Sequence, residues 1–114
     1  MEIREREVEG IKVIDLNGRV TKGESELLLR DRILDLAESG HSRLIINLGG
    51  VPYIDSSGLG EIVRCFTAMR RAGGRVGLTN LNRRLVDLFR VTKLSDIFET
   101  FESDAAAAAS LQQR

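Results

Sequence analysis

The chain has few of the residues that build disulfides, metal sites or active sites. Its 114 residues include one cysteine, Cys65, one histidine, His41, and no tryptophan. A single cysteine excludes an internal disulfide and a cysteine-based metal cluster. The sequence also lacks carboxylates at metal-ligand spacing and a glycine-rich phosphate-binding loop. We therefore expect no metal and no cofactor.

Long apolar runs and net charge are missing as well. No apolar run approaches the roughly 18 residues that a membrane span needs, and the first residues alternate in charge. We therefore expect neither a membrane span nor a signal peptide. The 17 basic and 17 acidic side chains cancel, and acids are interleaved with the arginines, which argues against nucleic-acid binding. These absences predict a cytoplasmic protein that binds neither membrane nor nucleic acid.

Catalysis has little support in the sequence. A small hydrolase that uses Ser56 would need His41 as its base, and no G-x-S-x-G turn surrounds Ser56 or Ser57. His41 follows a helix-ending glycine and is expected in an exposed loop. Cys65 lies inside a predicted helix and is expected to be a core or boundary residue rather than a reactive thiol. We therefore expect a protein without enzymatic activity.

The hydrophobic pattern predicts one domain over residues 1–114 in which strands alternate with helices. Residues 44–48 are almost continuously apolar, which is typical of a parallel strand covered on both faces. The predicted strands are residues 3–8, 11–16, 43–48, 75–80 and 97–101, and the predicted helices are residues 24–39, 57–72, a short segment after Asn82, and an alanine-rich segment beginning at Ser103, which with the tail occupies about 103–114. The order β-β-α-β-α-β-α-β-α predicts an α/β fold with a mostly parallel central sheet, an antiparallel edge hairpin and helices packed on the sheet.

The most informative segment is residues 53–60, which read Tyr-Ile-Asp-Ser-Ser-Gly-Leu-Gly. Here a predicted buried strand leads into the start of a helix, where unpaired N–H groups favour an anion. A serine at this position can cap the helix or can carry a phosphate. Gly58 and Gly60 each cost the helix roughly 1 kcal/mol relative to alanine, which is easier to understand if something approaches the backbone closely.

Residues 44–48 together with residues 51–60 resemble the signature of the STAS domain, the sulfate-transporter and anti-sigma-factor-antagonist family. The likeness covers nearly the whole chain and takes in Gly18, Gly73-Gly74 and residues 85–94. The single-domain form is most similar to the bacterial anti-sigma factor antagonists. In those proteins the first serine after the aspartate is phosphorylated by a serine kinase that is itself the anti-sigma factor. The resemblance therefore implies phosphorylation of Ser56, a kinase partner and a phosphoserine phosphatase.

The same resemblance implies a partner-binding surface around this serine. We expect it to include residues of the helix start and of the loop after the second strand: Asp55, Ser57, Gly58, Leu59, Arg19 and Thr21. Members of the family usually carry Gly-Glu-Leu-Asp in that loop. Here Arg19 and Thr21 replace the two acids, so the surroundings of Ser56 become more positive and the choice of kinase stays open.

A second interpretation also fits the sequence. The chain can be a STAS module without a phosphorylation switch, acting as a subunit of a transport or signalling complex, with Ser56 serving only as a helix cap. The sequence alone does not separate this interpretation from the first.

Overall fold

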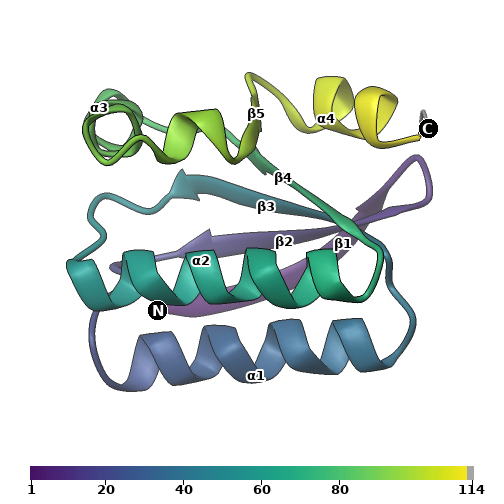
Figure 1. The fold of residues 1–114 in the computed structure, drawn as a ribbon, viewed down its shortest axis with the longest axis horizontal. Helices are drawn as coiled ribbons and strands as arrows, with labels where there is room; N and C mark the ends of the chain where they lie inside the picture. The colour runs from purple at the N-terminus through teal and green to yellow at the C-terminus, as the bar shows by residue number, and fades with distance from the viewer. Residues whose placement is uncertain (113–114) are drawn as a thin grey trace.

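The structure, a computed structural model, describes residues 1–112 and forms a five-stranded sheet with helices on both faces (Figure 1). The strands lie in the order β1-β2-β3-β4-β5; β1 is antiparallel to β2 and the other neighbours are parallel. The strands are β1 (Glu2–Val8), β2 (Ile11–Asn17), β3 (Arg43–Gly50), β4 (Arg75–Thr79) and β5 (Glu99–Phe101). The helices are α1 (Glu24–Glu38), α2 (Ser56–Arg71), α3 (Arg83–Val91) and α4 (Asp104–Leu111), with a short 3-10 turn at Leu94–Asp96. The predicted order of elements and the predicted α/β fold are confirmed.

The first two strands form the antiparallel edge hairpin that the sequence predicts. Their two-residue turn, Glu9-Gly10, has positive φ at both positions (50° and 82°), as the favoured tight hairpin turns require. The outer strand β1 is charged along most of its length, which discourages pairing with another chain at this edge. The hairpin thus ends the sheet on one side.

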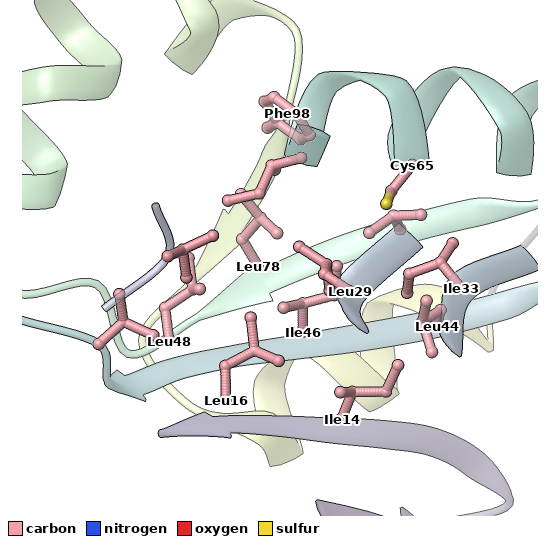
Figure 2. Close-up of a cluster of buried hydrophobic side chains, with 14 of the residues drawn as sticks. Ile14, Leu16, Leu29, Ile33, Leu44, Ile46, Leu48, Cys65, Leu78 and Phe98 are labelled. Carbon is pink, nitrogen blue, oxygen red and sulfur yellow. The ribbon is translucent and has the colours of Figure 1, made fainter. Parts of the chain in front are cut away.

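The sheet has an apolar core on each face. The larger core lies between the sheet and helices α1, α2 and α3, and the smaller one lies under α4. Side chains of β3 alternate between them: Leu44, Ile46 and Leu48 belong to the larger core, seen in Figure 2, and Ile45 to the smaller one. This double burial is what the nearly continuous apolar run of β3 predicts.

Four details differ from the sequence-based expectation. Helix α2 begins at Ser56, one residue earlier than predicted, and β4 ends at Thr79 because Asn80 takes a left-handed conformation with φ 57°. The last strand is shorter than predicted, since the 3-10 turn uses part of that segment. His41 is half-buried, with its Nδ1 atom buried and without a hydrogen-bond partner among the described residues. The final two residues of the predicted tail lie outside the described residues.

Candidate functional site

The helix start that the sequence singles out is capped by an aspartate and not by a serine. The Oδ1 atom of Asp55 accepts a hydrogen bond from the Gly58 N–H at 2.7 Å, and its Oδ2 atom accepts one from the Lys22 N–H at 3.0 Å. Ser56 is the first residue of α2 and is exposed. The cap role that the second interpretation gives to Ser56 is therefore wrong, because Asp55 fills that position. The unswitched module itself does not depend on that role. Ser56 thus lies exposed at the positive end of the helix.

The loop after β2 lies directly beside this helix start. Val20 forms a parallel bridge with Ile54: the Val20 N–H donates to the Tyr53 carbonyl at 3.1 Å, and the Asp55 N–H donates to the Val20 carbonyl at 3.1 Å. Two neighbouring segments at the carboxyl edge of the sheet are thus joined by backbone hydrogen bonds. The arrangement fixes the position of Arg19 relative to the start of α2.

The close approach of the Val20 loop to the start of α2 requires a glycine at position 58. A Cβ atom at Gly58 would lie 2.1 Å from the carbonyl oxygen of Val20, so any side chain would push the loop away from the helix. The close approach that the glycines suggested is therefore made by the chain's own backbone. At Gly60 a Cβ atom would meet nothing within 4 Å, so close approach within the chain does not explain this second glycine.

The electrostatics around Ser56 combine the carboxylate of Asp55 with the guanidinium of Arg19. Hydrogen bonds from the backbone of Gly58 and Lys22 hold the pKa of Asp55 below its usual value, and the charge of Arg19 acts in the same direction. The guanidinium of Arg19 lies 5.0 Å from the centre of the Tyr53 ring, in a cation–π contact. Asp55 is therefore ionised at neutral pH.

The predicted partner-binding residues differ in how much surface they offer. Arg19 is exposed, whereas Asp55, Ser57, Leu59 and Thr21 are half-buried and Gly58 is buried. Gly58 thus contributes packing rather than contact surface.

Lys22 was missed by the sequence analysis, although it is exposed and its backbone holds Asp55. Its position in the same loop as Arg19 is the signal that could have identified it.

No hydrolytic site is assembled around Ser56 within residues 1–112. His41 precedes β3 and Ser56 follows it, so the two residues lie at opposite ends of an eight-residue strand, which spans about 26 Å. The small hydrolase considered above therefore lacks its base. The described residues also hold no group of three His, Cys, Asp or Glu side chains that could bind a metal ion. None of the helices described here is both long and apolar enough to span a membrane.

The curated proteins that this chain resembles include bacterial anti-sigma-B factor antagonists. It is 43% identical over 72 residues to an anti-sigma-B factor antagonist of Bacillus subtilis, an alignment that covers 63% of this chain and 65% of that protein. It is 32% identical over 103 residues to the anti-sigma-B factor antagonist of Listeria monocytogenes, which covers 87% of this chain and 85% of that protein. The first alignment spans slightly less than two thirds of its relative.

The fold is shared with a solved structure in two chemical states. The anti-sigma factor antagonist SpoIIAA in its unphosphorylated form matches with a TM-score of 0.72 and 19% identity, covering 96% of both chains. The phosphorylated form of this Bacillus protein matches with a TM-score of 0.73 and 19% identity, covering 96% of this chain and 99% of that one. At this identity the match shows the fold.

The family model agrees with the sequence motif and with the structure. The STAS domain model matches residues 2–107, which include every strand and the helix start at Ser56. The chain belongs to the STAS domain family.

Proposed function

We propose that this protein is an anti-sigma factor antagonist that binds a serine-kinase anti-sigma factor and loses that binding when the kinase phosphorylates Ser56. The observation that carries the proposal is the exposed position of Ser56 as the first residue of α2, beside a cap that Asp55 already provides. The two relatives named anti-sigma-B factor antagonists support the same assignment. The proposal includes a cytoplasmic location and a phosphoserine phosphatase that resets the protein.

The proposed switch needs only local electrostatics. A phosphate adds roughly −1.5 to −2 charges, and the unpaired N–H groups at the start of α2 partly stabilise it. Because the Gly58 N–H donates the capping hydrogen bond to Asp55 and not to Ser56, a phosphate on Ser56 leaves this bond in place. The added charge and bulk then repel a partner that docks at this edge of the sheet, without any need for the domain to unfold.

Arg19 and Thr21 set the charge of this surface. In the family's usual pattern both positions are acidic, and here neither is. Arg19 now rests on the ring of Tyr53, and Lys22 lies in the same loop. We propose that this more positive surface selects a kinase with a matching acidic docking face.

Phosphopeptide mass spectrometry tests the site. After incubation with the kinase and ATP, we expect one phosphate on Ser56, none in the Ser56→Ala variant, and full labelling of the matched control Ser57→Ala. Labelling on Ser57 or Thr21 would overturn the site. Absence of any labelling would favour the unswitched module in a transport or signalling complex.

A further inference from the structure

A second candidate surface lies between α1 and α2, along the helices and away from the Ser56 end. Helices α1 and α2 run side by side on one face of the sheet (Figure 1), and the groove between them encloses about 420 Å³. Its apolar lining includes Leu34 of α1 and Val63 and Ala68 of α2. Leu34 is 43% exposed, so part of its side chain is open to a partner. The groove therefore offers apolar surface that the chain itself does not cover.

The rim of this groove is basic. Arg30, Arg64 and Arg71 line it, and the one acid in the lining, Glu61, is only 1% exposed. Arg30 donates two hydrogen bonds to Glu61 Oε1, at 3.0 and 2.7 Å, and Arg64 Nη1 lies 3.4 Å from the same oxygen. One buried carboxylate thus faces two guanidinium groups, and with Arg71 the lining keeps a net positive charge. The charges left at the surface of α2 are all cationic, although the whole chain has no net charge. The groove is thus apolar at its floor and positive at its edges.

We propose that this groove docks an acidic amphipathic helix of a partner protein. From Glu61 to Arg71 the groove follows about 15 Å of α2, or nearly three helical turns. A helix laid there inserts apolar side chains beside Leu34 and Ala68, and its carboxylates meet Arg64 and Arg71. In such a partner helix, apolar side chains at helical spacing contact the apolar floor of the groove, and acidic side chains on either side of them contact its basic rim.

This docking site acts independently of the proposed switch at Ser56. Eight residues separate Ser56 from Arg64 along α2, a rise of about 12 Å, which exceeds the Debye length of about 8 Å at physiological salt. A charge at Ser56 is therefore largely screened at the groove. The groove and the switch can succeed or fail separately in experiments.

NMR titration with a defined probe tests the groove. The probe is a helical peptide of about 14 residues with leucines on one face and glutamates elsewhere, and its control is the same peptide with lysine in place of glutamate. We expect the acidic peptide to shift amide signals of α1 and α2 around Leu34, Arg64 and Ala68, and the basic peptide to leave them unchanged. Shifts centred on another element, or equal effects of both peptides, would overturn the proposal.

Matched surface variants sharpen the test. Leu34→Glu, and the pair Arg64→Glu with Arg71→Glu, should each weaken peptide binding by about tenfold or more. The control variants are Val91→Glu and the pair Arg83→Glu with Arg84→Glu, at exposed positions of α3; Val91 is 81% exposed. Their affinity for the peptide should stay within twofold of that of the unmodified protein.

Two further outcomes are decisive. Ser56→Asp should leave peptide binding unchanged, which separates this site from the phosphorylation switch. If the groove signals shifted with protein concentration in the absence of peptide, a second copy of the chain would be the occupant and the proposal would be wrong.

Discussion

The two faces of the sheet are covered in different ways. On the face under α1, α2 and α3 the core is built of large side chains, including Leu29, Ile33 and Phe89, all fully buried. On the opposite face α4 contributes Ala107, Ala108 and Leu111 over a small patch of β2 and β3. Apolar burial therefore stabilises the first face far more than the second.

The second face compensates with polar contacts at the start of α4. The carboxylate of Asp104 accepts hydrogen bonds from Thr79 at 2.7 Å and from Asn47 at 3.1 Å, and it also accepts one from Arg6. Arg6 in turn donates to Asp15 at 2.7 and 2.9 Å. One carboxylate thus connects α4 to β1, β3 and β4. The candidate site at Ser56 belongs to the other face, where close packing keeps the helix start fixed.

The largest expected effect uses two neighbouring residues that face opposite ways. Ile45 and Ile46 are both fully buried, Ile45 under α4 and Ile46 in the larger core. We expect Ile46→Ala to lower the free energy of unfolding by about 4 kcal/mol and Ile45→Ala by about 2 kcal/mol, because α4 can move into the smaller cavity. Urea unfolding at neutral pH measures both. Equal losses would show that the two faces are equally rigid.

A second pair of variants probes the rigid face at the site itself. Gly58→Ala should cost about 2 kcal/mol, because its Cβ atom would collide with the Val20 carbonyl at 2.1 Å. Gly60→Ala should instead gain up to about 1 kcal/mol, because the position is open and alanine favours the helix. If the loop at Val20 is held firmly, the melting temperature should fall for Gly58→Ala and rise for Gly60→Ala. A neutral Gly58→Ala would contradict the rigid helix start.

The polar contacts that hold α4 on the sheet should be weaker than the apolar packing of α1 and α2 on the opposite face. Asp104→Asn weakens hydrogen bonds to a charged acceptor and should cost about 1 to 2 kcal/mol. We expect this loss mainly as faster amide hydrogen exchange in α4, with α2 unchanged. Equal acceleration in both helices would mean that α4 does not open on its own.

Lowering the pH should loosen α4 in the same way as Asp104→Asn does. Burial of Asp104 opposes its charge, but the hydrogen bond from Arg6 and those from its other donors outweigh burial and hold its pKa below the usual value. Because the pKa is lowered on folding, this stabilisation is present above the unfolded value of about 3.9 and is lost as the pH falls through the folded pKa. As the pH falls below about 4, the amides of α4 should therefore lose their protection against hydrogen exchange, relative to the intrinsic rate at each pH, before those of α2 do.

The smallest expected effect concerns Cys65, which lies in the larger core beside Glu61. Burial, and then the charge of Glu61, raises the pKa of this thiol to about 12. We expect no measurable reaction with a thiol reagent at pH 8 in the folded protein and complete reaction after unfolding in urea. Rapid reaction of the folded protein would show that the groove between α1 and α2 opens far enough to expose Cys65.

Sequence reasoning reached the order of the elements because each has a clear local signal. The apolar run of β3, the glycine of the first hairpin and the caps at Asn82 and Ser103 all lie within a few residues of what they determine. The start of α2 was located to within one residue, and the serine after the aspartate was correctly singled out as lying at the helix start.

The remaining features depend on contacts between distant residues. Whether aspartate or serine caps α2 depends on side-chain geometry, since both residue types are good caps. The burial of Glu61 against Arg30 comes from the packing of α2 against α1, and no local pattern in the sequence marks it. The contact of Asp104 with Arg6 joins residues 98 positions apart, and no local pattern marks such a pair.

The most direct test of the central claim compares the kinase-binding affinity and the melting temperature of the protein with and without a phosphate on Ser56. The account predicts that the phosphorylated protein loses at least tenfold in affinity, about 1.4 kcal/mol, while its melting temperature changes by no more than a few degrees. Ser56→Ala should bind like the unmodified protein and should not respond to kinase and ATP. Unchanged affinity after phosphorylation, or loss of binding through unfolding of the domain, would contradict a local switch at the start of α2.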